Sequence, residues 1–357
     1  MWPGCQLGRL PTGARAEVEA GAIASGRNQG WLPFAIVETM DQHRILMGEA
    51  PVEQNAESRE ADVGPFPVVI SGKLLRIAQI KDEPWLADAV DDPNAIIAQL
   101  KQMRPVPDIF TFSQRLPDIQ PRFNFRLEHD NLAAISISTY DHWWKSQLKA
   151  ATRNMVRKAE KAGIVTRVAE FDDALVNGIS AIYNETPVRQ GRRFWHYQKD
   201  TPTVRRENAT YLDRGVFIGA FLNDELVGFL KMVYVGQHAR VMQILSFVSH
   251  RDKAVTNALL AKAVEICSSK KLTHLVYANF SYGSKGEDSL SGFKRRNAFE
   301  RIDIPKYFVP LTMKGRVALA LGLHRSPADL LPRWLIVALL ATRKRWLGLF
   351  ASHRDAA

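Results

Sequence analysis

The alternation of apolar and polar residues predicts short strands and amphipathic helices along most of the chain, beginning near Phe66. Apolar residues at every second position indicate strands, and apolar residues at every third or fourth position indicate helices. Asp91-Asp92-Pro93 predicts a helix start, because Asp caps a helix and Pro is tolerated in its first turn. Strands are predicted around this helix at 67–80 (two strands about Ser71-Gly72), 108–113, 122–127 and 132–137.

A longer helix is predicted over 140–162, with Gly163 just past its end. Basic residues recur along it at a spacing of four, and like charges at that spacing cost about 0.2–0.5 kcal/mol per pair. The row is either a solvated face or a contact with an anionic partner that offsets this cost. Its members are Lys145, Lys149, Arg153, Arg157 and Lys161, beside an apolar stripe of Trp144, Leu148, Ala151, Met155 and Ala159.

The second half of the chain has a regular order of elements, which predicts an α+β fold with a central mixed sheet. Expected strands lie at 164–169, 216–222, 226–235, 241–248, 274–280 and 301–311, and expected helices at 172–184, 203–212, 257–268 and 288–297. Domain organisation follows from the same pattern. Residues 1–64 are predicted to be an extension, 65–144 and 145–312 two structural halves, and 313–357 a basic helical tail.

Charge and composition narrow the functional classes. The chain of 357 residues carries a net charge of +11, and its 46% apolar and 24% charged residues exclude a wholly disordered chain. The charge is −4 over 1–64, +9 over 65–312 and +6 over 313–357. No secretory signal and no apolar run of about 18 residues is present, so a cytoplasmic location is expected. The nine histidines show no ligand spacing, so no metal is expected, and Cys267 fits a core position.

Four segments, in this element order, resemble the GCN5-related N-acyltransferase (GNAT) superfamily, in particular its Fem-type branch. They are TRNMVRKAEKAGIVTRVAEF, NETPVRQGRRFWHYQKD, SHRDKAVTNALLAKAVEIC and FKRRNAFERIDIPKYFVPLT. The resemblance implies two half-barrel domains with central mixed sheets. It also implies an acyl-CoA or similar activated donor and an amine acceptor, such as an amino sugar or an envelope-glycan precursor.

One segment departs from the family pattern. The glycine-rich signature that binds acetyl-CoA is replaced by residues 249–256, which contain no glycine. Glycines let backbone amides approach a pyrophosphate closely. The helix that follows still offers a positive dipole end, so an anion site remains feasible. Coenzyme A and another carrier, such as an aminoacyl-tRNA, therefore both remain open as donors, and tRNA is not the favoured one.

The segment 184–197 is the predicted acceptor site. Glu185 and His196 are candidate general bases. Arginine suits a phosphate or carboxylate because its guanidinium bonds bidentately, and aromatic rings stack on a sugar or base. The alternative is a packed cover over the sheet, with snorkelling arginines. The candidate substrate-binding residues here are Arg189, Gln190, Arg192, Arg193, Trp195 and Tyr197, with Tyr277 added from the strand near 277.

The predicted donor site combines three segments. The loop at 250–257 contributes His250, Arg251, Lys253 and Asn257, unless it is a plain capped helix with Thr256 as N-cap. Alternation places Asn279 on one face of its strand with Tyr277. The resemblance implies that Asn279 contacts the donor and that Tyr282 protonates the leaving thiolate. Lys294 and Arg295 are candidates for donor phosphates, or else lie on a solvated helix end.

The tail at 328–350 combines an apolar centre with basic flanks and terminal tryptophans, which is typical of a helix on an anionic membrane surface. Docking on the body is the alternative. The predicted function is N-acyl transfer without a covalent enzyme intermediate, because no nucleophile with a partner base is visible. Two alternatives remain open: an aminoacyl-tRNA-dependent peptidyltransferase, and a non-catalytic membrane-associated protein. DNA is not expected as a partner.

Overall fold

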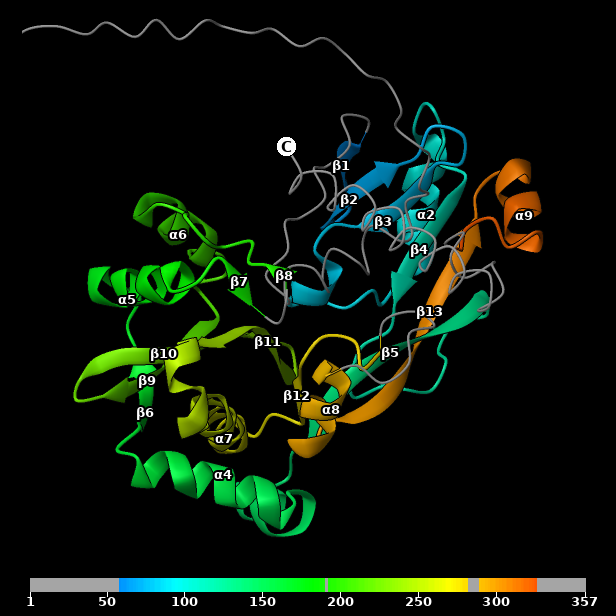
Figure 1. Ribbon diagram of the computed structural model, residues 1–357. Helices are drawn as coiled ribbons and strands as arrows, with labels where there is room; N and C mark the ends of the chain where they lie inside the picture. Colours follow the sequence, from blue (N-terminus) through cyan, green and yellow to red (C-terminus); the bar gives the residue numbers. More distant parts are fainter. Residues whose placement is uncertain (1–57, 190–191, 282–288, 326–357) are drawn as a thin grey trace, which may run out of the picture. The chain divides into compact units, whose positions relative to one another are not determined.

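A mixed sheet of eleven strands organises the described residues, and a separate small sheet pairs β7 (Val188–Arg189) with β8 (Arg192–Arg193) (Figure 1). The computed structural model describes residues 58–189, 192–281 and 289–325. The sheet order is β1-β2-β3-β4-β13-β5-β12-β11-β10-β9-β6. The strands are β1 (Arg59–Val63), β2 (Phe66–Ser71), β3 (Ile77–Ile80), β4 (Ile109–Ser113), β5 (Arg126–Ser136), β6 (Val165–Ala169), β9 (Gly215–Leu222), β10 (Glu225–Val235), β11 (His238–Ser246), β12 (His274–Val276) and β13 (Glu300–Pro310).

Helices cover both faces of this sheet. The longer ones are α2 (Pro93–Gln102), α4 (Ala150–Lys161), α5 (Asp173–Asn184), α6 (Thr201–Asn208), α7 (Val255–Ser269), α8 (Ser289–Arg296) and α9 (Met313–Ala320). Alternation along the strands separates the two faces. Ile218 and Leu230 pack in the α7 core, whereas their neighbours Phe217 and Phe229 pack in the α5–α6 core on the opposite face.

The two halves of the sheet repeat one arrangement. Three antiparallel strands are followed by a helix and a fourth strand parallel to the third: β1-β2-β3-α2-β4 in the first half and β9-β10-β11-α7-β12 in the second. Each half then supplies one long strand that joins the other half. Strand β13 pairs with β4, β5 pairs with β12, and the two long strands pair with each other at the centre.

The strand register gives this arrangement an approximate twofold axis through the paired residues Asp130 and Ile304. Four residues further along each long strand, Ala134 pairs with Val276 and Phe308 pairs with Thr111. Thr111 and Val276 in turn are the last residues of the two parallel pairings, β3–β4 and β11–β12. Beyond them the parallel strands are no longer paired, so both halves open next to the axis.

Most predicted elements are present. Helix α2 begins at Pro93, and the Asp92 carboxylate caps it by accepting from the amides of Asn94 and Ala95. The α+β fold with a mixed sheet is confirmed, and Cys267 is fully buried in the α7 core. Two details differ: structure already begins at β1, and the two strands expected at 122–127 and 132–137 form one strand, β5.

The predicted helix over 140–162 is wrong as one continuous helix. A short turn and a π-helical segment (Trp143–Gln147) end at Leu148, whose backbone is extended, and α4 starts afresh at Ala150. Leu148 and Trp143 are both buried, so core packing holds this break. Lys145 therefore does not share a helix with Arg153, and Met155 is exposed, since the buried face is Thr152, Val156 and Ala159.

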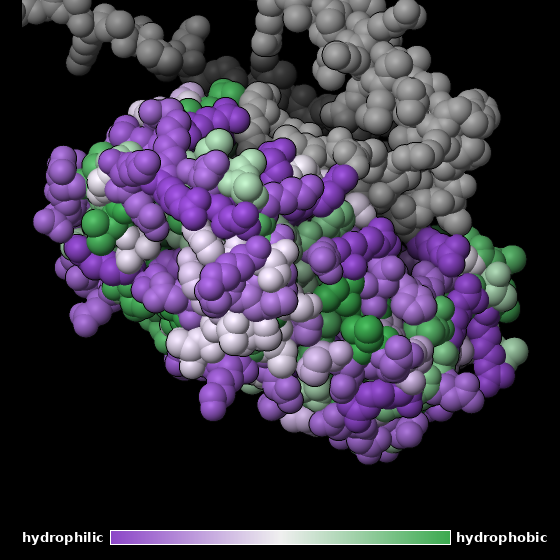
Figure 2. Space-filling model, turned by 90° about the horizontal axis from the view of Figure 1, so that it is seen from below, coloured by the Kyte–Doolittle hydropathy of each residue, from purple (hydrophilic) through white to green (hydrophobic). Residues whose placement is uncertain are grey.

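The solvent face of α4 is polar, and α4 packs on α7 from outside (Figure 2). Arg153 turns back and donates to the carbonyl oxygens of Trp144 and Leu148, so it caps the preceding segment. Lys149, Arg157, Lys158 and Lys161 remain exposed. Among the described residues, no helix is long and apolar enough to cross a membrane.

Candidate functional site

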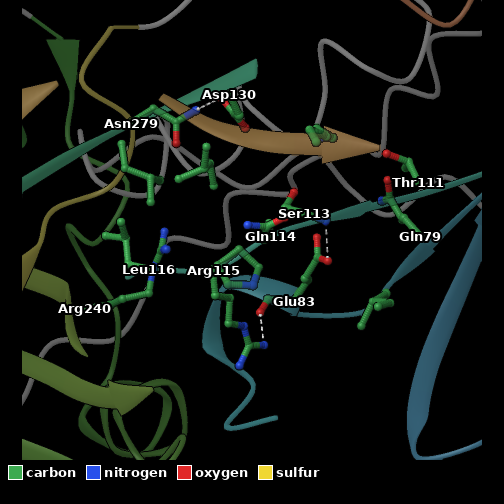
Figure 3. A pocket seen from close by; sticks show the side chains of 15 residues that line it. Gln79, Glu83, Thr111, Ser113, Gln114, Arg115, Leu116, Asp130, Arg240 and Asn279 are labelled. Atoms are coloured by element: carbon green, nitrogen blue, oxygen red, sulfur yellow. Dashed lines mark hydrogen bonds between the residues drawn. The ribbon is translucent and has the colours of Figure 1, made fainter. Parts of the chain in front are cut away.

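A cavity of about 90 Å³ lies where the two halves of the sheet meet (Figure 3). Its lining comes from both halves: Gln79 and Thr111 from β3 and β4, Arg240 from β11, and Asn279 just after β12. The central pair of the twofold axis, Asp130 and Ile304, also lines it. We call it the central cavity. Ligands of open sheets bind where parallel strands separate at their carboxyl ends, and the central cavity lies beside two such openings.

Asp130 is held in the central cavity by a short network. Its Oδ1 accepts from Nδ2 of Asn279 at 3.2 Å and from the amide of Asn131 at 2.8 Å. The backbone oxygen of Asn279 accepts from Nζ of Lys294, which is fully buried. Asp130 is only half-buried. One carboxylate is thus oriented by both halves and still faces the cavity, which is the arrangement that a proton acceptor requires.

The opposite side of the central cavity contains two arginines and a second carboxylate, Glu83, which accepts from the amide of Ser113. The two arginines are Arg115 and Arg240. Burial lowers the pKa of the adjacent His238 to about 3, and the charges of Arg240 and Arg115 add to this lowering. Burial also lowers the pKa of Arg115, while nearby acids raise it. The buried Oγ1 of Thr111 has no hydrogen-bond partner within the part of the chain that is described. These groups can receive a carbonyl oxygen or an anion.

A second cavity, of about 200 Å³, shares the segment Ser113–Leu116 with the central cavity. Side-chain hydrogen bonds hold that segment in place. The Gln114 side chain donates to the backbone oxygens of Asp118 and Gln120 and accepts from the hydroxyl of Tyr307.

The predicted acceptor residues lie elsewhere, in a packed layer between α5 and the end of β11. Arg189 donates to the backbone oxygens of Ser246 and Ile182, and its guanidinium lies 4.6 Å from the Phe194 ring. Trp195 is half-buried beneath the ammonium of Lys199, at 4.0 Å. Tyr197 packs partly against the α5–α6 core, and Arg193 is exposed. This geometry matches the alternative of a cover over the sheet.

Glu185 is fixed by backbone amides. Its carboxylate accepts from the amides of Val248 and Ser249, at 2.5 and 2.9 Å, and lies 3.4 Å from Arg189. Burial alone would raise the pKa of Glu185, but these hydrogen bonds and the Arg189 charge outweigh it and lower the pKa. A carboxylate so stabilised is a weak base. It also places a negative charge at the start of the predicted donor loop.

His196 is buried in a network of its own. Its ring stacks on Tyr183 at 4.2 Å, its Nε2 lies 3.1 Å from Nε2 of Gln243, and its Nδ1 faces Glu207 at 3.8 Å. Burial lowers the pKa of His196 and outweighs the hydrogen bond to Glu207, which raises it. The imidazole is therefore neutral at pH 7. The contacts of His196 described above involve no residue that lines the central cavity, so its role as general base stays a prediction.

The predicted donor residues are placed as follows. His250, Arg251 and Lys253 lie on a 3₁₀ turn (Val248–Lys253), and Ala254, in the left-handed region, precedes α7 in place of the expected cap Thr256. Asn257 donates to Oδ1 of Asn297, which ties α7 to the end of α8. Thus this segment packs α7 and α8 together and leaves Arg251 exposed.

Three further predictions concern the strand end and α8. Asn279 lies in the central cavity, as described. Tyr277 is buried, which raises its pKa, and its ring lies 5.2 Å from Nζ of Lys294. Lys294 is buried rather than solvated, whereas Arg295 is exposed. Four of the sequence predictions fall outside the described residues: Gln190, Tyr282, the Arg192 side chain and the tail at 328–350.

Four residues line the central cavity without being among the candidates that the sequence indicates: Asp130, Arg115, Arg240 and Thr111. Asp130 and Arg240 interrupt otherwise ordinary strands, and their only sequence signal is a charged residue at a position where alternation points toward a core. Among the described residues, no three His, Cys, Asp or Glu side chains lie close enough to hold a metal ion.

One buried cation near α6 gives a testable pH effect. Nζ of Lys231 is buried and donates to the backbone oxygens of Asn208 and Thr210, and burial lowers its pKa to about 8. The unfolded chain therefore binds more protons between pH 8 and 10.5, so the free energy of unfolding should rise with pH there, by at most about 3 kcal/mol. Urea unfolding at pH 7.5 and 9.5 measures this rise.

The controls are Lys231→Met, which removes the titrating group, and Lys158→Met, which removes an exposed lysine on α4. The rise should disappear in the first variant and persist in the second. An equal rise in all three proteins would show that Lys231 keeps an ordinary pKa.

No protein-family model matches the chain, and no curated protein matches it. Solved structures do match. The C-terminal domain of a putative lysylphosphatidylglycerol synthetase from Agrobacterium fabrum is 10% identical, over 80% of this chain and 96% of that one, with a TM-score of 0.47. FemX is 9% identical over 79% and 92%, with a TM-score of 0.47. A tandem GNAT protein from the clavulanic acid biosynthesis pathway is 11% identical over 79% and 98%, with a TM-score of 0.39.

These likenesses concern the fold.

Proposed function

We propose that this protein transfers an acyl group from an activated donor to an amine, with the reaction taking place in the central cavity. The observation that supports this most is the Asp130 carboxylate, oriented by Asn279 and facing Arg240 across a cavity built from both halves. Acyl transfer to an amine needs a proton acceptor and a stabiliser of the developing oxyanion. The cavity provides both. The resemblance of the sequence to the GNAT superfamily supplies the reaction class.

The step is a direct displacement. Asp130 takes a proton from the substrate ammonium, and the free amine attacks the carbonyl carbon of the donor. A C–N bond forms, negative charge builds on the carbonyl oxygen near Arg240, and the bond to the donor sulfur or oxygen breaks. The leaving thiolate or alkoxide takes up the second proton, which the attacking nitrogen loses after the C–N bond has formed, and Asp130 returns the first proton to solvent. A cavity of about 90 Å³ holds only the reacting groups, so the rest of each substrate binds outside it.

The position of the Glu185 carboxylate favours an aminoacyl ester over acyl-CoA as the donor. The Glu185 carboxylate occupies the amides of Val248 and Ser249, at the loop where the resembled family binds the pyrophosphate of CoA. A pyrophosphate approaching there would meet a fixed negative charge. An aminoacyl-tRNA does not require these amides and would be held by backbone phosphates at other basic surfaces.

Both donor classes can be tested with the full-length protein. Radiolabelled acetyl-CoA and radiolabelled aminoacyl-tRNA are incubated in parallel with a panel of amines that contains amino sugars, lysine and amine-bearing glycan precursors. The proposal expects label in an amide product with one donor class. Hydrolysis of the donor without amide formation, or no turnover of either donor over the whole panel, would contradict it.

A further inference from the structure

Helix α9 presents a row of large apolar side chains to solvent. Met313, Val317 and Leu321 are 70%, 54% and 65% exposed and follow each other at a spacing of four, which aligns them along one side of the helix. Leu323, just after the helix, is 54% exposed. The other side of α9, at Ala318 and Leu319, packs on Ile109 and Phe308 of the sheet. The helix is thus anchored, and its apolar row has no described partner.

The turn between β2 and β3 extends this row. Leu75 and Ile77 pack against the buried side of α9, and the preceding Leu74 is 71% exposed. We call the five side chains together the α9 surface: Leu74, Met313, Val317, Leu321 and Leu323. In Figure 1 α9 lies at the right-hand edge, and in Figure 2 apolar side chains reach the surface beside polar ones on that side.

Basic residues surround the α9 surface. Lys73, Lys314, Arg316 and Arg325 are exposed, and the sequence contains no acidic residue from Val68 to Ile80 or from Leu311 to Arg325. Two acids from other described segments reach this region. Asp108 is buried and lies 3.2 Å from Lys314, and Glu128 accepts from His324 and Arg325. The four exposed basic residues outnumber these two acids.

We propose that the α9 surface docks on an anionic lipid membrane. Exposed apolar side chains insert at the boundary between headgroups and acyl chains, and a cationic rim binds anionic headgroups, each Lys or Arg adding about 1 kcal/mol near the surface. Neighbouring apolar side chains of this size rarely stay in water on a monomeric protein. The excess of basic over acidic residues around the row favours anionic lipid over a second copy of this chain, because two such surfaces would repel each other.

This inference is independent of the proposed function, since neither the central cavity nor the predicted donor loop contributes to the α9 surface. Membrane docking would place the proposed reaction beside envelope precursors, but the vesicle experiment tests the lipid contact without any assay of the reaction.

The test is sedimentation of the full-length protein with vesicles of phosphatidylcholine alone or of phosphatidylcholine mixed with anionic phosphatidylglycerol. We expect binding only to the anionic vesicles, weakened by salt. The vesicle partition should fall at least fivefold in a triple variant, Met313→Gln with Val317→Gln and Leu321→Gln. Most of the salt dependence should be lost in a double variant, Lys314→Gln with Arg316→Gln.

The matched control replaces three exposed apolar residues elsewhere, Met155→Gln, Val165→Thr and Val168→Thr, which are 46%, 57% and 57% exposed. Its partition should stay at the wild-type level. If the triple variant unfolds, the single variant Met313→Gln replaces it, because Met313 is the most exposed residue of the row. The single variant should also lower the partition.

Three results would overturn the proposal. They are no binding of the wild type to anionic vesicles, an equal loss in the control and α9 variants, and a partition that is unchanged in the α9 variants. Sedimentation velocity adds a fourth: a wild-type dimer that becomes monomeric in the α9 variant, without a change in vesicle binding, assigns the surface to a second copy.

Discussion

Replacing Asp130 by Asn should lower the rate of amide formation at least about 100-fold, with little change in stability. The amide keeps the shape of the carboxylate and can still accept from Asn279 Nδ2 and the Asn131 amide, so the cavity should remain intact. It cannot take a proton from the substrate ammonium, and general base catalysis contributes about 10²–10⁴-fold. Because the missing proton acceptor acts in the chemical step, the loss should appear in kcat rather than in KM.

The neighbouring strand offers a matched control. Asp303 of β13 pairs with Asn131, one residue from the twofold axis, but alternation turns it to the opposite face of the sheet, where it is exposed and binds Arg301. Asp303→Asn makes the same chemical change outside the cavity and should keep full activity. If Asp130→Asn retains at least half of the wild-type kcat, the base must be another group and the proposed mechanism fails.

Replacing Glu185 by Ala should lower the free energy of unfolding at pH 7 by about 1–3 kcal/mol, because two amides and Arg189 lose a charged partner. The carboxylate has a lowered pKa in the folded protein, so its contribution is present above the ordinary value of 4.5 and is lost as the pH falls through the lowered value. The difference between wild type and variant should therefore shrink in acid.

Chemical denaturation at pH 7, 5 and 3.5 measures this difference, with Glu160→Ala on the exposed face of α4 as control. The same variant tests the donor class. If the carboxylate keeps phosphates away from the loop, Glu185→Ala should bind coenzyme A measurably more tightly than wild type in calorimetry. Tight binding of coenzyme A by the wild type, with no gain in the variant, would restore acyl-CoA as the favoured donor.

The sequence predicted local structure well where one residue decides it. Asp92 and Pro93 mark the start of α2, and Asn223-Asp224 lies in the hairpin between β9 and β10, where both residues adopt the left-handed backbone of such turns. It failed at Leu148. The helical pattern runs through this position, but burial of Leu148 and Trp143 stabilises an extended residue that the local sequence does not prefer.

The candidate site shows the same limit. The dense polar segment at 184–197 was the strongest local signal for chemistry, yet Arg189 and Glu185 bind the protein's own backbone. Many polar residues in one segment indicate that the segment makes hydrogen bonds. They do not indicate whether the partners of these bonds belong to a ligand or to the protein itself. Alternation placed Asn279 on one face of its strand and the family resemblance suggested donor contact. In the structure Asn279 lines the central cavity, while the donor contact stays a prediction.

The sequence by itself determined the class of fold, the order of its elements and most of their boundaries, because these follow from local periodicity and from caps and turns. Only the tertiary structure decided that the halves exchange strands β5 and β13, and hence that Asp130, Arg240 and Asn279 meet at one axis. Their positions are 110 and 39 residues apart in the chain. Strand pairing between distant segments brings them together, and it depends on the whole sheet rather than on any local pattern.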